Sequence, residues 1–214
     1  MLAVEELHFG YRRGEPIFSG SSLALDGGSV TVVIGPSGCG KSTLLYLLGL
    51  MLTPWSGTVL FRGERVSSLS DGERSRLRAS HFGFVFQDAA LDPSRSILDN
   101  VCEPGVYAGM KRRILRHAAS DLLDRFQVGL RADHRPGEVS GGQAQRVALC
   151  RALIVQPDVI LADEPTGNLD RLSADVVLDA LAEAAHENGA TVVIASHDPE
   201  VAVRSDQTIQ LSHE

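Results

Sequence analysis

The segment from Gly35 to Ser42 reads Gly-Pro-Ser-Gly-Cys-Gly-Lys-Ser and matches the pattern G-x-x-x-x-G-K-[ST]. Successive backbone N–H groups of such a loop form a concave nest for phosphate oxygens, and the following helix points its positive end at the anion. Lys41 adds a point charge for the β- and γ-phosphates, and the Ser42 hydroxyl can ligate Mg²⁺. The pattern predicts a nucleotide site made by Gly35, Pro36, Ser37, Gly38, Cys39, Gly40, Lys41, Ser42 and Thr43.

Two acids, Asp163 and Glu164, follow the apolar run from Val159 to Ala162. Asp163 is placed to hold Mg²⁺ through water and so to complete the metal site begun by Ser42. Glu164 would face the opposite side of the pleat and could polarise an attacking water as a general base. An acidic strand end is also an ordinary structural feature, but its place about 120 residues after a phosphate loop favours the catalytic interpretation.

A second anion site is predicted at Ser140-Gly141-Gly142-Gln143, where a helical run from Gly142 to Val155 begins. Ser140 suits a helix N-cap, and the two glycines allow a phosphate to approach the helix start closely. The chain therefore has one complete and one incomplete phosphate site. This combination suggests that two copies face each other and that each completes the site of the other.

Together these features resemble the ATP-binding cassette ATPases, and the resemblance covers the chain end to end. Ser140 to Gln143 looks like the signature motif of that family, with Val139 in place of the more usual Leu. Gln87 looks like the glutamine that senses Mg²⁺ and the membrane partner. Three further residues match the family in order: Tyr11 as the aromatic that stacks on adenine, Asp170 in the loop that crosses between subunits, and His197 as a γ-phosphate contact.

The resemblance implies an ATPase that converts ATP and water into ADP and phosphate, with ATP and Mg²⁺ as its bound groups. It also implies a head-to-tail pair of cassettes, identical or not, that closes on two Mg-ATP molecules. Each ATP would lie between Lys41 and Ser42 of one subunit and Ser140 and Gly142 of the other. The implied catalytic residues are Glu164, His197, Gln87 and Lys41, and the implied metal ligands are Ser42, Gln87 and Asp163.

Composition and charge exclude several other classes. Hydrophobic residues make up 43% and charged residues 22%, as in an ordinary globular protein. The net charge of −7 repels phosphate backbones, so we expect no nucleic-acid partner. The short basic runs are interpreted as solvated loops or helix faces: Arg12-Arg13, the series Arg74, Arg76 and Arg78, and Lys111-Arg112-Arg113 with Arg116.

Targeting and redox signals point to the cytoplasm. No apolar stretch reaches the ~18 residues that a membrane crossing needs, and Met1 to Leu7 lacks the basic-then-apolar order of a secretory signal. The three cysteines have no metal-type spacing, which indicates a reduced protein without disulfides. Cys39 lies in the phosphate loop near a helix start, so we expect alkylation of this thiol to block nucleotide binding and ATP to protect it. Cys102 and Cys150 are interpreted as small core residues.

Three apolar runs rich in Val and Ile predict strands that are buried on both faces, as in a parallel sheet covered by helices. They are Ser29 to Ile34, Val159 to Ala162 and Thr191 to Ala195. Small or polar residues follow each run, and ligands of open α/β sheets bind beyond the carboxyl ends of the strands. The first 30 residues and Gly57 to Phe61 instead predict antiparallel strands, with turns at Gly27-Gly28 and Arg62-Gly63.

From about Asp88 to Gln156 helical periodicity replaces the strand signal, and Pro104-Gly105 and Pro136-Gly137 punctuate the region. The apolar face of a helix over 110–126 is expected to hold Ile114, Leu115, Ala118, Ala119, Leu122 and Leu123. We predict an α/β P-loop NTPase core of mostly parallel sheet with helices on both faces, an N-terminal antiparallel β subdomain and an inserted helical subdomain. The chain 1–214 is then a single ABC ATPase domain, with 1–87 and 157–214 as its core and 88–156 as its helical part.

Other proteins with a phosphate loop fit less well. A nucleotide kinase would lack Ser140 to Gln143. A DNA-maintenance ATPase with the same head would need coiled-coil arms or zinc modules, and neither pattern is present. A translation-associated cassette protein would carry two heads in one chain, which 214 residues do not accommodate.

The resemblance implies an integral membrane permease as a separate partner, which would hold the chain on the cytoplasmic face of the membrane. Its coupling helix would be received at Asp88 to Asn100. Glu164 to Asp170 is similar to the lipoprotein-releasing, macrolide-export and cell-division branch, whereas Ala89 to Ser96 departs toward the peptide-importer type. Two functions stay open: driving transport through the permease, or mechanotransmission to a membrane partner without moving a solute.

Overall fold

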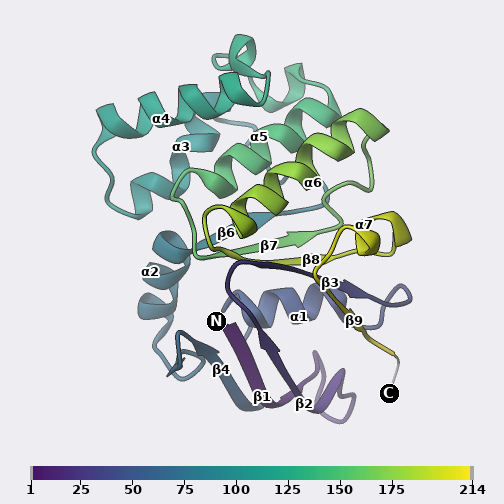
Figure 1. Ribbon diagram of the computed structural model, residues 1–214. Helices are drawn as coiled ribbons and strands as arrows, with labels where there is room; N and C mark the ends of the chain where they lie inside the picture. The colour runs from purple at the N-terminus through teal and green to yellow at the C-terminus, as the bar shows by residue number, and fades with distance from the viewer. Residues whose placement is uncertain (1, 213–214) are drawn as a thin grey trace.

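The computed structural model describes residues 2–212, which form two sheets and the helices around them (Figure 1). The larger sheet is parallel throughout, in the order β6-β7-β8-β3-β9. Its strands are β3 (Ser29–Ile34), β6 (Phe82–Val85), β7 (Val159–Asp163), β8 (Thr191–Ala195) and β9 (Gln207–Gln210). The smaller sheet is antiparallel, in the order β2-β1-β4-β5, with β1 (Leu2–Phe9), β2 (Phe18–Leu25), β4 (Ser56–Phe61) and β5 (Glu64–Arg65).

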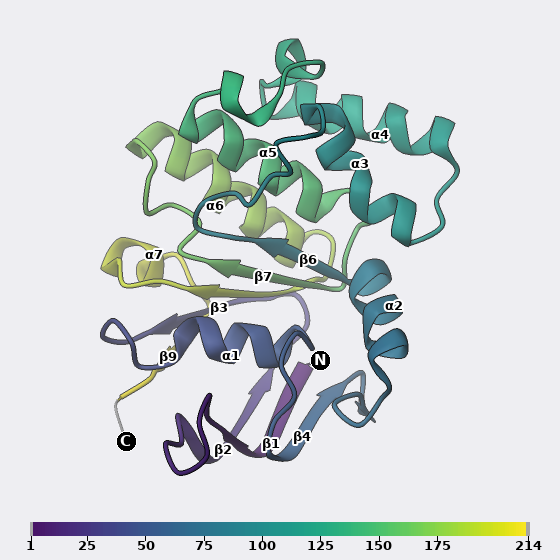
Figure 2. The ribbon, with the colours of Figure 1, turned by 180° about the vertical axis from the view of Figure 1, so that it is seen from behind.

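The helices cover both faces of the parallel sheet. Figures 1 and 2 show α1 (Lys41–Leu48) between the two sheets, with α5 (Gly141–Leu153) and α6 (Arg171–His186) on the opposite face of the parallel sheet. The elements α3 (Ile97–Tyr107) and α4 (Arg112–Arg125), with the 3₁₀ turns Gly129–Arg131 and Pro136–Glu138, lie beyond α5. Two further helices, α2 (Asp71–His81) and α7 (Pro199–Val203), flank the sheet. Within residues 2–212, no helix combines the length and hydropathy that a membrane crossing requires.

Strand β8 shows why these strands are apolar on both faces. Val192 and Ile194 belong to the core formed with α5 and α6, whereas Val193 and Ala195 belong to the core formed with α1 and the antiparallel sheet. Successive side chains of a strand point to opposite faces, so a sheet with a core on each side needs an uninterrupted apolar run. The predicted parallel sheet, antiparallel β part and two-sided helical cover are confirmed.

The interruption expected at Pro104-Gly105 is wrong, because α3 continues through both residues to Tyr107. Pro104 lies in the last part of the helix, where few further turns depend on it. Gly105 is buried, and a Cβ atom there would lie 2.4 Å from Leu115 Cδ1. The pair therefore permits close packing of α3 against α4 rather than a break in the chain.

The apolar face predicted for 110–126 is correct except at its start. Leu115, Ala119 and Leu123 are fully buried in the helical part of the core, whereas Ile114 is 54% exposed. The helix begins only at Arg112, so Ile114 lies in its first turn and points away from the neighbouring helices. One large apolar side chain of α4 is thus left in solvent.

The long connection from β6 to α3 is fixed by one buried amide. Asn100 is completely buried, and its Oδ1 accepts from Asp92 N at 2.7 Å. Its Nδ2 donates to Asp92 O at 3.1 Å and to Ser96 O at 2.9 Å. A side chain that satisfies both donors and acceptors of a loop backbone holds that loop in one conformation.

We expect Asn100→Ala to lower the free energy of unfolding by about 2–3 kcal/mol, because the buried side chain no longer bonds the N–H and the carbonyl of Asp92. Thermal unfolding should show a Tm lower by ~5 °C or more. The exposed Asn188→Ala is the control and should change stability by less than ~0.5 kcal/mol. Equal stability of the two variants would show that Asn100 does not hold the loop.

Candidate active site

The predicted site residues gather where three parallel strands end side by side. In the register of the sheet, Asp163 of β7 and Val33 of β3 both pair with Ala195 of β8. The phosphate loop follows β3, Glu164 follows β7, and Ser196 and His197 follow β8. Three segments that are distant in sequence therefore share one edge of the sheet, as ligand sites of open α/β sheets do.

The phosphate loop is held from within by Lys41 and Cys39. The Lys41 ammonium donates to the carbonyl oxygens of Gly35 at 2.8 Å and Pro36 at 3.1 Å. A Cβ atom on Gly35 would lie 2.7 Å from Cys39 Sγ, so Gly35 is needed for the chain to pass over the thiol. Cys39 is only 5% exposed. A reagent must therefore open the loop to reach the thiol, and the block of nucleotide binding by alkylation of Cys39 stays a prediction.

Ser42 and Tyr46 lie one helical turn apart on α1, and both reach Asp163. The Tyr46 hydroxyl donates to Asp163 Oδ2 at 3.5 Å, and Ser42 also hydrogen-bonds this carboxylate. Burial raises the pKa of Asp163, and the nearby Glu164 adds to this, although Ser42, Tyr46 and the Lys41 charge act in the opposite direction. Tyr46 was not predicted, yet its position four residues after Ser42 was a usable signal.

The residues around Asp163 fit a divalent cation bound together with a nucleotide. The raised pKa shows that Lys41 and the hydrogen bonds do not fully offset the burial of this carboxylate, and a carboxylate beside a hydroxyl is an oxygen donor set of the kind that Mg²⁺ takes. Among residues 2–212 there is no cluster of three or more His, Cys, Asp or Glu side chains that could hold a metal alone. The remaining ligands would therefore be phosphate oxygens and water, as is usual for Mg²⁺.

Glu164 is held by the end of the neighbouring strand. Its Oε1 lies 2.7 Å from His197 Nδ1, and its Oε2 accepts from the Ser196 hydroxyl at 3.3 Å. The Glu164 N–H donates to Ala195 O at 2.9 Å, and its φ of 45° turns the chain sharply out of the sheet. The side chain of Glu164 is 13% exposed and that of His197 is 68% exposed. The two acids thus diverge as predicted, Asp163 toward α1 and Glu164 toward β8.

This arrangement gives Glu164 and His197 distinct capacities. Each carboxylate oxygen keeps further acceptor capacity with which it could orient a water and take up its proton. If His197 donates through Nδ1–H to Glu164, its Nε2 is an acceptor in the neutral ring and a donor in the imidazolium. Contact of Nε2 with a phosphate oxygen therefore requires the charged ring. Ser196 had no predicted role, and only its place between strand end and His197 could have suggested one.

Tyr11 lies beside the phosphate loop with its ring in solvent. The residue is 64% exposed, and its hydroxyl lies 3.3 Å from Thr43 Oγ1 at the start of α1. Its ring packs edge-on against Phe9, with the centroids 5.3 Å apart. An exposed aromatic face tethered next to a phosphate site is suited to stacking on a purine base.

Ser140 forms the predicted N-cap of α5. Its hydroxyl accepts from Gln143 N at 3.2 Å, and Gln143 Oε1 accepts from Ser140 N at 2.9 Å, a reciprocal capping box. Asp170 is the N-cap of α6 and accepts from Ser173 N at 3.0 Å, a structural role that was not predicted. A Cβ atom on Gly142 would lie 3.4 Å from Ser173 Oγ, so the two caps are neighbours.

The phosphate loop and Ser140 begin helices on opposite faces of the parallel sheet (Figures 1 and 2). Gln87 is exposed just after β6, and with Gly141 and Asn168 it lines a small cavity of about 100 Å³. The structure therefore brings Gln87 near the start of α5. It does not place Ser140 to Gln143 beside the phosphate loop of the same molecule.

The loop after Gln87 is clamped by α5. Arg151 donates to Ala90 O at 2.6 Å and to Ala89 O at 2.8 Å, and both alanines have left-handed φ values of 46° and 60°. Gln145, which is buried, donates to Phe86 O at 3.0 Å on the other side of Gln87. Neither Arg151 nor Gln145 was predicted, because nothing in their local sequence indicates a contact with a loop some 60 positions away.

We expect Asp163→Asn to stabilise the unliganded chain and to abolish its Mg²⁺-dependent nucleotide binding. Asparagine removes the buried charge whose cost the raised pKa reports, so Tm should rise by ~2–4 °C, about 1 kcal/mol. The gain is largest above the raised pKa, where Asp163 is ionised, and shrinks as the pH falls through it. Calorimetry and titration with a fluorescent ATP analogue, with and without Mg²⁺, would measure both effects.

The matched control is Asp158→Asn, just before the start of β7, which should change the thermal stability in the opposite direction. Burial acts to raise the pKa of Asp158, but hydrogen bonds from His81 and Arg62 and their charges outweigh it and lower the pKa. Asp158 thus contributes stability above its ordinary pKa, which is lost as the pH falls through the lowered value. Asp158→Asn should lower Tm and leave Mg²⁺-dependent binding intact. A lower Tm for Asp163→Asn as well would refute the assignment of a strained, cation-ready carboxylate.

Comparison with known proteins identifies the fold and its relatives. A family profile described as ABC transporter matches residues 18–167. The lipoprotein-releasing system ATP-binding protein LolD of Paramagnetospirillum magneticum is 41% identical over 214 residues, covering 99% of this chain and 95% of the relative. The macrolide export ATP-binding/permease protein MacB of Rhodopseudomonas palustris is 48% identical over 190 residues, covering 89% of this chain and 29% of MacB. A dimeric post-hydrolysis structure of the ATP-binding cassette MJ0796 with ADP and Pi is 33% identical, with a TM-score of 0.92 over 99% of this chain and 94% of that one.

Proposed function

The chain belongs to the ABC transporter family, and on that premise we propose that it closes as a dimer on two Mg-ATP molecules and drives a separate membrane permease. Membership confirms the predicted resemblance and implies that the chain binds and hydrolyses ATP. The proposal adds Mg²⁺, the roles of individual residues, the coupling to transport and a position on the cytoplasmic face of the membrane.

The observation that carries the hydrolytic mechanism is the place of Glu164 at the same sheet edge as the phosphate loop, with its two oxygens in contact with Ser196 and His197. In the proposal the loop Gly35 to Thr43 binds the phosphates and Tyr11 stacks on adenine. Mg²⁺ would be held by Ser42, Asp163 and Gln87 and would neutralise charge on the β- and γ-phosphates. Glu164 takes a proton from the attacking water, and protonated His197 donates through Nε2 to the γ-phosphate.

Pairing of two cassettes is supported by the separation of the two phosphate sites within one molecule. The phosphate loop and Ser140 lie on opposite faces of the parallel sheet, so Ser140 to Gln143 can serve only the nucleotide of a second copy or of a related cassette. Asp170 is exposed near Ser140 and would meet the partner at the same surface. The MJ0796 relative is itself dimeric and holds ADP and Pi.

A separate permease is supported by the relatives and by a groove. LolD is an ATP-binding protein of similar length from a lipoprotein-releasing system, whereas MacB combines ATP-binding and permease in its name and is far longer. We propose that residues 88–156 form the helical part of a single domain 1–214 and that the partner docks where this part meets the core. These relatives favour transport over mechanotransmission.

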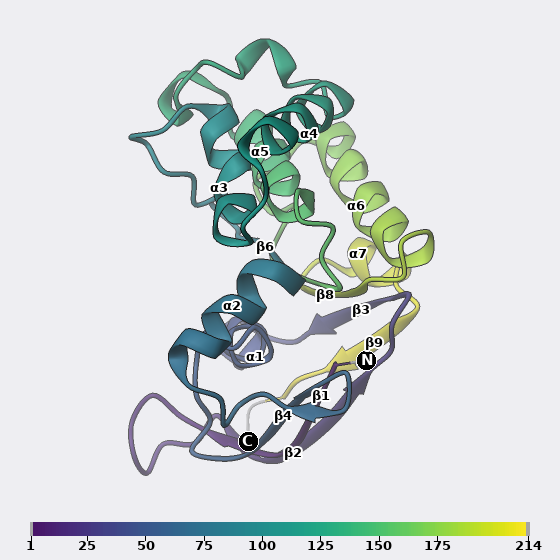
Figure 3. The same ribbon diagram turned by 90° about the vertical axis from the view of Figure 1, so that its left-hand side faces the viewer.

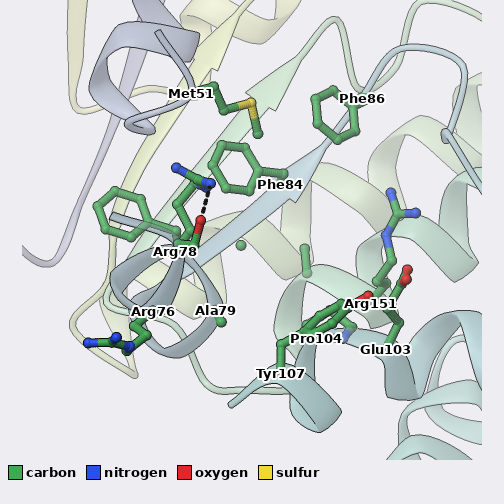
Figure 4. A pocket seen from close by; sticks show the side chains of 14 residues that line it. Met51, Arg76, Arg78, Ala79, Phe84, Phe86, Glu103, Pro104, Tyr107 and Arg151 are labelled. Atoms are coloured by element: carbon green, nitrogen blue, oxygen red, sulfur yellow. Dashed lines mark hydrogen bonds between the residues drawn. The ribbon is translucent and has the colours of Figure 1, made fainter. Parts of the chain in front are cut away.

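The groove lies between α2 and the C-terminal end of α3 and has a volume of about 650 Å³. Figure 4 shows Met51, Phe84 and Phe86 on one side of the groove, facing Pro104 and Tyr107 across it. Phe84 and Phe86 stack with their centroids 6.0 Å apart. An apolar groove with exposed aromatic walls suits a short amphipathic helix of a partner.

The groove is connected directly to the loop after Gln87. Arg151 lines the groove and holds the carbonyls of Ala89 and Ala90, so a partner helix seated there contacts the residue that fixes this loop. The predicted docking segment, Asp88 to Asn100, therefore adjoins the groove through Arg151 and does not itself form the walls. This contact offers a physical route from partner to Gln87.

We expect Glu164→Gln to bind ATP, to lose turnover by ~10²–10⁴-fold and to accumulate as an ATP-bound dimer, because glutamine cannot take the proton from water. Phosphate release and size-exclusion chromatography with Mg-ATP would measure the two effects. Lys41→Ala should instead weaken ATP binding itself, since it removes charge from the phosphate site, and the exposed Glu187→Gln should resemble wild type. Turnover of Glu164→Gln near the wild-type rate would mean that Glu164 is not the base.

We expect the double variant Met51→Ser and Tyr107→Ser to lose its membrane partner, because both side chains are exposed groove walls. The test is purification of the Glu164→Gln chain with Mg-ATP from detergent-solubilised membranes of its host. Leu130→Ser removes a 96% exposed side chain elsewhere and should retain the partner. A multi-span protein recovered equally with the double variant would place docking outside the groove.

A further inference from the structure

The connection between α3 and α4 presents cations and apolar side chains together on the surface. We name this region the connector surface; it comprises Val106, Tyr107, Lys111, Arg112, Arg113 and Ile114, all of them exposed. The apolar members are exposed by 62% at Val106, 69% at Tyr107 and 54% at Ile114. Three large apolar side chains within nine positions are a concentration of exposed hydrophobicity that ordinary solvated loops do not need.

The charge of this region is opposite to that of the whole chain. Residues 104–120 contain four Lys or Arg and no Asp or Glu, although the chain carries a net charge of −7. The two acids of α3 are already paired: Asp99 with Arg116 at 3.0 Å and Glu103 with Arg95 at 3.2 Å. Among the residues that the structure describes, Lys111, Arg112 and Arg113 have no salt-bridge partner. They form a positive patch directed to solvent.

These cations do not serve the stability of α4. Lys111 is the N-cap residue and makes no side-chain capping bond, and the first turn contains Arg112 and Arg113 but no acid. The N-terminus of a helix carries positive partial charge, so cations there are unfavourable and Asp, Ser or Thr would be preferred. By contrast α2, α3, α5, α6 and α7 each have an N-cap Ser or Asp whose side chain accepts a backbone bond. Among the described helices longer than eight residues, only α4 lacks a side-chain N-cap, and this departure from the preferred sequence points to a function for its cations.

The connector surface adjoins the groove in which the membrane partner would dock. Tyr107 belongs to both, since it lines the groove opposite α2. Figure 3 shows α2, the C-terminal end of α3 and the start of α4 on the same side of the molecule. A membrane protein seated in this groove therefore lies beside the connector surface.

We propose that the connector surface binds the anionic headgroups of membrane lipids, as a second contact beside the permease. This inference rests on the proposed function for its orientation, but its chemistry stands on the surface itself. Lys111, Arg112 and Arg113 pair with lipid phosphates, while Val106, Tyr107 and Ile114 enter the interfacial layer, where aromatic and aliphatic side chains next to cations are stabilised. Each cation near an anionic surface strengthens attachment and does so less at high salt.

The test is cosedimentation of the full chain with vesicles of phosphatidylglycerol and phosphatidylcholine, compared with phosphatidylcholine alone. We expect binding to the anionic vesicles only, weakened by salt. The variant Lys111→Ser, Arg112→Gln and Arg113→Gln should bind these vesicles on the order of 100-fold less. The control changes three exposed arginines elsewhere, Arg12→Gln, Arg13→Gln and Arg65→Gln, with the same loss of charge, and should bind as wild type.

The thermal stability of the lipid-binding variant should rise while its vesicle binding falls. Serine in place of Lys111 supplies the missing cap and the two glutamines remove cations from the positive helix end, so the variant should unfold ~2–4 °C higher than wild type. Weaker vesicle binding by a more stable protein cannot be explained by misfolding. The variant should also retain ATP hydrolysis, so a failure of the lipid contact is distinguishable from a failure of the proposed ATPase mechanism.

Several results would overturn the proposal. One is equal binding to neutral and anionic vesicles, or equal loss in the variant and its control. Another is retained vesicle binding by the variant together with loss of the copurifying membrane protein, which would make the surface a protein contact. The third is displacement from vesicles by RNA or inorganic phosphate at concentrations comparable to the lipid, which would show a general polyanion patch.

Discussion

The register of three parallel strands is the constraint on which the site depends. Because β3, β7 and β8 run in the same direction and Val33, Asp163 and Ala195 stand at one level, the residues that follow them must emerge at one edge. Antiparallel pairing of any one strand would send its acid or histidine to the far edge. The register in turn depends on the apolar runs, which are buried against helices on both faces and cannot slip by one residue without exposing themselves.

The same two-sided burial explains why the two predicted phosphate sites of one molecule are separated. A parallel sheet needs helices on each face, and here α1 with the phosphate loop covers one face while α5 with Ser140 covers the other. Each helix start is suited to an anion for the same reason, its unpaired N–H groups and positive dipole end. In the proposed pairing, the sheet keeps the two sites of one chain apart, so each ATP must be bound by two chains at once.

Local motifs and apolar periodicity predicted the strands and the polar residues at their ends. They did not predict features that depend on contacts between residues distant in the chain. The three central strands, the N-cap role of Ser140 and the divergence of Asp163 from Glu164 follow from local patterns, and the structure has them. Pro104 was misread because its place within α3 depends on the packing of Gly105 against Leu115. Ile114 was assigned to the buried face because periodicity does not reveal where α4 begins.

The contacts that no local pattern reveals are those that tie the parts together. Helix α5 holds Phe86 O through Gln145 and the carbonyls of Ala89 and Ala90 through Arg151. It also begins at Ser140, about 16 Å from Arg151 along a helix that rises 1.5 Å per residue. A rigid helix of this length cannot shift at the groove without shifting at its capped end.

The left-handed backbone at Ala89 and Ala90 is costly for residues with a side chain, and the bonds from Arg151 to both carbonyls help to hold it. A partner that competes for Arg151 therefore acts on a strained loop next to Gln87 and, through the same helix, on the residues offered to the second cassette. A single element with two fixed ends thus joins the groove, the loop after Gln87 and the surface around Ser140. Transport energy in the proposed function would pass through α5, because this helix bonds the loop after Gln87 and begins at Ser140.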